Sequence, residues 1–174
     1  MNQAAVVGVR RSGGFDSAAA ARLIALLLPA SLLAGAYWSQ YFGGLYPCEM
    51  CWWQRYAHFA ALVPAALAFT APAAWSRSRA LTLLAALAIA VSGAIGVYHA
   101  GVEAKIFEGF TQCTALSNSS STAELLKQIT QAPLVRCDEV QWRFLGLSLA
   151  AWNAIISLGG ASLILVLSLR SKRA

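Results

Sequence analysis

Two cysteines separated by two residues, Cys48 and Cys51, stand between two long apolar stretches of the sequence. A pair at this spacing can close a small disulfide or share a metal ion. Pro47 interrupts regular structure just before the pair and the helical pattern resumes after it, so Cys51 is expected near a helix N-terminus. The helix dipole there favours a thiolate, and Arg55, one turn further along the same face, adds positive charge. This stretch therefore favours redox chemistry, with half of a zinc site or two buried core cysteines as the alternatives.

The other two cysteines, Cys113 and Cys137, lie in the one long polar segment, residues 101–142. Two functions from different classes compete for the set of four. Either the two pairs are redox-active disulfides of an oxidoreductase, or the four thiolates hold a structural zinc in a scaffold protein. Zinc sites favour two short Cys-x-x-Cys knuckles, and the 24-position interval between these cysteines leaves the second knuckle missing. A third possibility, a carrier of reductant across the bilayer, requires cysteines deep within the spans, and the sequence has none there.

Composition assigns the chain to the membrane. Of its 174 residues 59% are hydrophobic and only 11% are charged, whereas soluble domains carry about 25% charged residues. The net charge of +6 does not form a nucleic-acid-binding stripe, because the basic residues fall at alternate ends of successive apolar stretches. These basic residues are Arg10, Arg11 and Arg22, then Arg77 and Arg79, and finally Arg170, Lys172 and Arg173.

The apolar stretches predict an all-α membrane protein, a four-transmembrane-helix bundle that forms a single domain over 1–174. The predicted spans are 23–42, 52–70, 80–98 and 144–169, each long enough for a hydrocarbon core of about 30 Å. The basic ends place both termini and the tail 1–21 in the cytoplasm, and the loops 43–51 and 99–143 in the periplasm. A cleaved signal peptide ending at Ala34-Gly35-Ala36 is the rival interpretation of the first span.

Several polar residues are candidates within or beside the spans. Arg55 lies about one turn inside the second span, where an arginine is costly unless it has a partner or snorkels, so it is a functional candidate. His99 ends the third span near the same membrane face. His58 and Asn153 are expected to make structural hydrogen bonds. A capping box beginning at Ser121 predicts a short amphipathic helix through Ile129, either on the membrane surface or as an ordinary loop helix.

A wider set of residues matches a known family. The matching features are Pro47-Cys48-x-x-Cys51 followed by Gln54-Arg55, then His99, and most strongly the stretch Cys137-Asp138-Glu139-Val140-Gln141-Trp142-Arg143-Phe144-Leu145-Gly146-Leu147. With the order of spans and loops, they make residues 20 to 170 resemble the DsbB family of disulfide bond formation proteins. The resemblance implies a four-helix bundle in the bacterial inner membrane that re-oxidises a periplasmic DsbA-type protein and passes the electrons to ubiquinone or menaquinone.

The resemblance also implies a role for each cysteine. Cys113 would be attacked by the thiolate of the partner, and Cys137 is its pair mate. Cys137 would exchange with Cys48 between the loops, so disulfides Cys48–Cys51 and Cys113–Cys137 at rest would give way to Cys48–Cys137 during turnover. Cys51 would face the quinone and form a thiolate–quinone adduct or charge-transfer pair.

Two further residues are implied at the quinone. Arg55 would contact the headgroup and His99 would lie near the same pocket. A dithiol oxidant of the DsbA kind has a reduction potential of about −120 mV. Glutathione-level acceptors have lower potentials and cannot take its electrons, so a lipid quinone is the natural electron acceptor. The sequence departs modestly from the family at Glu49-Met50, where an acid disfavours a thiolate at Cys48. His58 has no role that the resemblance supplies.

Overall fold

The computed structural model describes residues 16–109, 121–122 and 135–170. Cys113 lies outside the described residues, and so does most of the amphipathic helix predicted after Ser121. The roles predicted for that cysteine and that helix therefore stay predictions.

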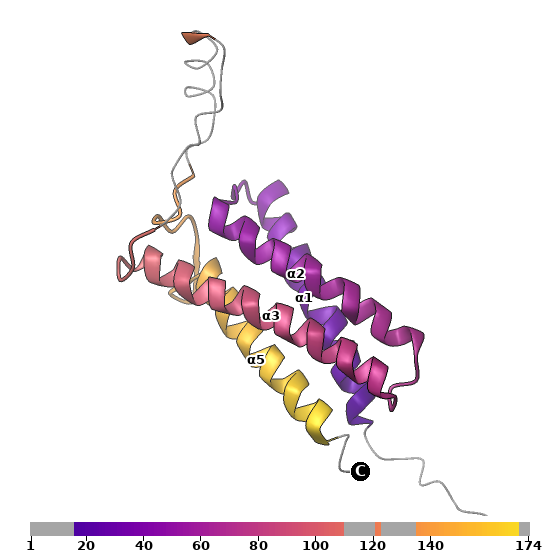
Figure 1. The fold of residues 1–174 in the computed structure, drawn as a ribbon. Coiled ribbons are helices and arrows are strands. Elements are labelled where there is room, and N and C mark those ends of the chain that lie inside the picture. The colour runs from indigo at the N-terminus through magenta and orange to yellow at the C-terminus, as the bar shows by residue number, and fades with distance from the viewer. Residues whose placement is uncertain (1–15, 110–120, 123–134, 171–174) are drawn as a thin grey trace, which may run out of the picture.

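In the described part of the chain, four long helices run side by side (Figure 1). They are α1 (Ser17–Tyr41), α2 (Glu49–Leu67), α3 (Ser76–Glu103) and α5 (Leu149–Arg170). A short 3₁₀ turn, η1 (Ala68–Thr70), continues α2. The turn between α2 and α3 lies at the same end of the bundle as the start of α1 and the end of α5, and the start of α2 and the end of α3 lie at the opposite end (Figure 1).

The helix bounds differ from the predicted spans where local signals extend or delay a helix. The first helix begins at Ser17, inside the predicted tail, because the Asp16 carboxylate caps it by accepting from the backbone N–H groups of Ala18 and Ala19. The last helix begins at Leu149 rather than at 144. Before it, β1 (Arg143–Phe144) and β2 (Leu147–Ser148) form an antiparallel hairpin that pairs Phe144 with Leu147. Both turn residues, Leu145 and Gly146, have positive φ, as a two-residue hairpin turn of type I′ requires.

Arg22 on α1 covers the carbonyl groups at the end of α2. Its guanidinium donates to the backbone oxygens of Ala68 at 3.2 Å and Ala71 at 2.9 Å, and lies 4.7 Å from the centre of the Phe69 ring. The Ser78 hydroxyl of α3 donates to the same Ala68 oxygen at 2.9 Å. Helix ends leave unpaired carbonyls, so these contacts satisfy that end and tie α1 and α3 to it.

Three of the helices are long and apolar enough to cross a membrane, judged by length and composition over the described residues. They are α1, α3 and α5, with mean hydropathies of 1.8, 2.3 and 1.8. The chain is thus a mostly helical protein of the multi-pass membrane class. Helix α2 is not apolar enough to be counted among them, because its first half carries Gln54, Arg55 and His58, which are all buried. Its crossing of the membrane stays a prediction.

Small residues let α3 and α5 approach closely. A Cβ atom built on Gly96 would lie 3.0 Å from the Ala150 oxygen and 3.0 Å from the Ala154 nitrogen, both in the α5 backbone. At Gly93 the nearest atoms belong to the Leu158 side chain, at 2.8 Å. Helices pack in membranes through such small residues, and here the contact sets how near α5 comes to the site described below.

Gly96→Ala is expected to destabilise the bundle, because the added methyl group meets backbone that cannot move aside. Overpacking of this kind destabilises by about 1–3 kcal/mol. Gly159→Ala is the matched control on α5, where an added Cβ meets nothing within 4 Å and alanine is the better helix former. Thermal loss of helical circular dichroism in detergent measures both. A Gly96→Ala protein as stable as the control would contradict the close contact.

Candidate functional site

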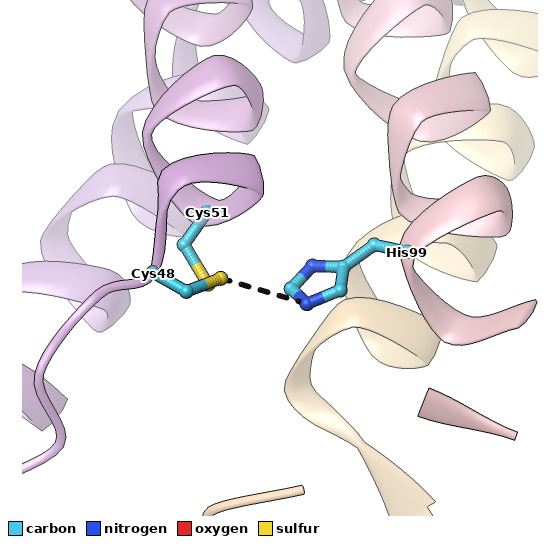
Figure 2. Close-up of side chains that lie close together, drawn as sticks. All are labelled: Cys48, Cys51 and His99. Carbon is cyan, nitrogen blue, oxygen red and sulfur yellow. Dashed lines mark hydrogen bonds between the residues drawn. The ribbon is translucent and has the colours of Figure 1, made fainter. Parts of the chain in front are cut away.

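Cys48 and Cys51 meet at the N-terminus of α2. Cys48 occupies the N-cap position, immediately before the helix, and is buried, and Cys51 lies in the first turn and is half-buried. Their Sγ atoms are 3.2 Å apart (Figure 2). A disulfide has an S–S length of about 2.05 Å, so the structure holds two thiols that a small side-chain movement would join. The pair is therefore placed for reversible disulfide chemistry.

Cys137 approaches the same sulfur from the other loop. Cys48, Cys137, Met50 and Val102 form one buried cluster, and the Cys48 and Cys137 side chains are hydrogen-bonded. That hydrogen bond, a second one with Cys51, and burial raise the pKa of the Cys48 thiol well above its usual range. Cys48 is thus the cysteine whose side chain contacts both of the other described cysteines.

Charged residues hold the Cys137 loop in place. The Asp138 carboxylate accepts from Lys105 at 2.5 Å and from Arg136 at 2.8 Å, and Lys105 also donates to the Asp138 backbone oxygen at 2.9 Å. Arg136 and then Lys105 hold the pKa of Asp138 well below its usual range. Further along, the Gln141 amide donates to the Tyr46 oxygen at 2.7 Å, which joins this loop to the turn before α2.

His99 of α3 faces Cys48 across the helix interface. Its Nε2 lies 3.6 Å from the Cys48 sulfur, the contact drawn in Figure 2. Its Nδ1 lies 2.9 Å from the Gln54 amide nitrogen, which can only donate. Nδ1 is therefore the acceptor, and the neutral ring carries its hydrogen on Nε2, which lies near the Cys48 sulfur, the Cys137 backbone and, at 3.8 Å, the Glu103 carboxylate. This places a hydrogen-bond donor beside the Cys48 sulfur.

Arg55 is buried without a carboxylate partner among the described residues. Its guanidinium donates to the Gln40 side-chain oxygen at 2.6 Å and the Ala36 backbone oxygen at 3.1 Å, both on α1. It also lies over the Tyr37 and Trp52 rings, 4.9 and 5.1 Å from their centres. Neutral acceptors and aromatic faces satisfy its hydrogen bonds but leave its charge uncompensated, so the site favours an anion beside it.

A cavity of about 330 Å³ opens beside these groups, between α1, α2 and α5. Cys51, Arg55 and His99 all line it, with apolar walls from residues such as Leu32 and Ile156. This size and mixture of apolar walls with a few polar groups is typical of a small-molecule site. The cavity therefore joins the thiol pair and the arginine in one compartment.

The structure brings five of the six predicted site residues together: Cys48, Cys51, Cys137, Arg55 and His99. The sixth, Cys113, lies outside the described residues. Sequence reasoning left out several polar residues that also line the cavity, among them Gln54, His58, Asn153 and Glu103. The available signal was their polarity within apolar stretches, because buried polar groups in a membrane bundle need partners.

The thiol pair and His99 together also resemble part of a metal site. Ligand atoms of Cys48, Cys51 and His99 all lie within 4.8 Å of one another. Structural zinc takes four protein ligands, and within the described ranges only these three gather there. The zinc alternative from the sequence therefore has three ligands in place, one of them a histidine that was not in the predicted thiolate set.

Comparison with known proteins identifies the family. The family model described as disulfide bond formation protein DsbB matches residues 18–167. The disulfide bond formation protein B of Xanthomonas oryzae pv. oryzae (strain MAFF 311018) is 31% identical over 157 residues, covering 87% of this chain and 90% of the relative. The protein of that name from Marinobacter nauticus is 29% identical over 149 residues, covering 84% and 86%. No solved structure matches the chain. The chain belongs to the DsbB family, which confirms the resemblance seen in the sequence and supports a general role in disulfide oxidoreduction.

Asp138→Asn is expected to slow closure of a disulfide between Cys48 and Cys137 by a factor of a few, because the loop loses its charged anchors. The rate is measured in a Cys51→Ser, Cys113→Ser background after addition of a mild oxidant. Because the pKa of Asp138 is lowered in the folded protein, its ion pairs with Lys105 and Arg136 are fully present at any pH above the ordinary pKa of a carboxyl group. They are lost only as the pH falls through the lowered pKa of Asp138 in the folded protein.

Glu139→Gln is the matched control, because Glu139 is exposed and its contact with Arg136 is longer, at 3.5 Å. Equal rates in the Asp138→Asn and Glu139→Gln proteins would show that the anchors do not position Cys137.

Proposed function

We propose that this chain is an inner-membrane protein dithiol:quinone oxidoreductase. It re-oxidises a periplasmic DsbA-type partner and passes the electrons to a membrane quinone, ubiquinone or menaquinone, in support of disulfide bond formation. The observation that carries the proposal is the contact of Cys48 with both Cys51 and Cys137. One sulfur next to two possible partners is the geometry that thiol–disulfide exchange needs.

The cysteines divide the work between the loops. The partner's thiolate attacks the Cys113–Cys137 disulfide at Cys113 and leaves Cys137 as a thiolate. Cys137 then attacks Cys48 of the Cys48–Cys51 disulfide, and Cys51 leaves as a thiolate. The partner's second thiol then attacks the mixed disulfide and releases Cys113, and Cys113 attacks Cys137 to re-form the Cys113–Cys137 disulfide and release Cys48. Cys48 and Cys51 are then both thiols and hold the two electrons and two protons taken from the partner. The Nε2–H group of His99 supports negative charge on Cys48 during this exchange.

The residues around the cavity fit a quinone headgroup. The apolar walls suit its ring, the Arg55 guanidinium suits a carbonyl oxygen, and Cys51 lies on the same wall. A bound quinone supplies the capacity to take up two electrons and two protons, which Cys48 and Cys51 lose when they close their disulfide. Arg55 orients the ring and stabilises negative charge beside Cys51, because no carboxylate in the described part of the chain pairs with its guanidinium.

The same proposal includes a topology. All four helices cross the membrane, with both termini and the α2–α3 turn in the cytoplasm and both cysteine loops in the periplasm. Two observations support it: the basic residues of α1, α3 and α5 gather at one end of the bundle, and the described cysteines lie at the other. The proposal also includes the single membrane domain over 1–174 that the sequence predicts.

A structural zinc protein is the second candidate, favoured by the gathering of Cys48, Cys51 and His99. The oxidising compartment proposed for the loops disfavours persistent thiolates. A permanently bound zinc would also leave the contact between Cys48 and Cys137 without a function.

Anaerobic mixing with a reduced DsbA-type protein and a soluble ubiquinone is expected to consume the quinone in proportion to the partner oxidised. Acid quench and peptide mapping are expected to show Cys48–Cys51 and Cys113–Cys137 at rest and Cys48–Cys137 during turnover. Purified protein with stoichiometric zinc, four free thiols and no quinone consumption would favour the scaffold instead.

Arg55→Ala is expected to lower the rate of quinone reduction about 10- to 150-fold, the effect of losing a charged hydrogen bond worth roughly 1.5–3 kcal/mol. Arg55→Lys is expected to restore part of the rate, since it returns the charge without the planar fork. Single-turnover oxidation of the partner is the internal control, because that exchange takes place in the loops. Unchanged quinone kinetics in Arg55→Ala would reduce this arginine to a structural anchor.

A further inference from the structure

A continuous line of side-chain hydrogen bonds runs from His58, inside the bundle, to Cys48. His58 Nε2 lies 2.9 Å from the Asn153 oxygen, the Asn153 amide nitrogen lies 2.7 Å from the Gln54 oxygen, and the Gln54 amide nitrogen lies 2.9 Å from His99 Nδ1. His99 Nε2 completes the line at the Cys48 sulfur. The line crosses three helices, since Asn153 belongs to α5 and His99 to α3.

Each residue in this line donates its hydrogen bond to the next one, in the direction from His58 to Cys48. The Asn153 nitrogen donates to Gln54, so the Asn153 oxygen is left to accept, and it accepts from the Ser157 hydroxyl at 3.1 Å as well as from His58. The Ser92 hydroxyl, 2.9 Å from the same His58 nitrogen, donates to the Gln54 backbone oxygen and accepts in turn. His58 Nε2 therefore carries the hydrogen, and its other nitrogen, Nδ1, is an acceptor.

That acceptor is buried and has no hydrogen-bond partner in the described part of the chain. His58 is 3% exposed and belongs to the wall of the cavity that also contains Arg55 and Cys51. A buried acceptor without a donor is unfavourable, so a ligand that fills the cavity and brings an O–H group gains by supplying one. His58 and Arg55 are three residues apart on α2, which places them one turn apart on neighbouring positions of the helix surface.

We propose that His58 is a second ligand-contacting residue of this cavity, whose Nδ1 accepts a hydrogen bond from a hydroxyl group of the hydroquinone product. Asn153 and Gln54 are positioning residues that fix its tautomer. The inference rests on the proposed function, because it names the reduced quinone as the ligand of the same cavity. It adds that the cavity distinguishes the reduced from the oxidised form of that ligand.

The discrimination follows from donor and acceptor chemistry. A quinone carries two carbonyl oxygens, which only accept hydrogen bonds, whereas a hydroquinone carries two hydroxyl groups, which also donate. Arg55 has only donors and serves a carbonyl oxygen or an oxyanion. His58 Nδ1 has only a lone pair and serves a hydroxyl. Tighter binding of the reduced form makes reduction within the cavity more favourable than reduction of the same quinone in solution.

The test measures binding of a short-chain ubiquinone and of its hydroquinone in a Cys51→Ser background, which cannot form the Cys48–Cys51 disulfide and so does not exchange electrons with the ligand. His58→Gln keeps a polar group toward Asn153 but has none at the Nδ1 position, and is expected to weaken hydroquinone binding about 5- to 10-fold while changing quinone binding less than about 2-fold. His58→Asn returns an acceptor to the Nδ1 position and is expected to recover most of the hydroquinone affinity.

Nitrogen-15 NMR of histidine-labelled protein gives a readout independent of binding strength. The chain has two histidines, so the spectrum is simple, and His58→Gln assigns it. We expect an unprotonated Nδ1 and a protonated Nε2 on His58, with only the Nδ1 signal shifting when hydroquinone is added. Asn153→Leu is expected to mix the two tautomers.

The outcomes separate this inference from the function on which it rests. If neither ubiquinone nor its hydroquinone binds the cavity while His58 is intact, the quinone proposal itself fails. If both bind and His58→Gln weakens them equally or not at all, the quinone proposal stands and the role of His58 is overturned. A protonated Nδ1 on His58 would overturn it as well.

Discussion

The structure depends on the pairing of polar side chains inside an apolar bundle. Water is excluded there, and a buried polar group without a partner costs about 1–3 kcal/mol. Gln54, Ser92 and Asn153 stand on three different helices and satisfy one another, so each helix can take only one rotation and one height against the others. The close contact at Gly96 supports the same register from the apolar side, since it sets how near α5 lies to α3. The position of His99 beside Cys48 follows from that register.

Cys48 lies between the Cys137 loop and the helix bundle, and different interactions hold these two parts in place. On the loop side, exposed ion pairs around Asp138 bring Cys137 toward the bundle, an arrangement that water and salt can loosen. On the bundle side, buried hydrogen bonds hold His99 and the unneutralised Arg55 in fixed places. A movable thiol therefore approaches a rigid site. That division suits a protein in which one cysteine must change partners while the groups that stabilise charge stay still.

Sequence reasoning reached the helices and the cluster of chemical residues for the same physical reason. Apolar stretches of membrane length and alternating basic ends imply that Cys48, Arg55 and His99 share one end of the molecule, and the structure has them there. It did not reach the bonds among Gln54, Asn153 and His58, because partners on different helices depend on the rotation of each helix. Helix bounds differed where one local group acted, as Asp16 does at the start of α1.

The cavity has exposed residues on two of its walls, Ser31 and Gly35 on α1 and Ile156 on α5. In a bundle embedded as proposed, that side faces acyl chains rather than water. A ligand would then enter sideways by diffusion within the bilayer. Its supply would be governed by its abundance per area of membrane, and a water-soluble analogue would act only after partitioning into lipid. The chain length of an isoprenoid tail would matter for delivery and little for recognition, since the tail can remain outside among the lipids.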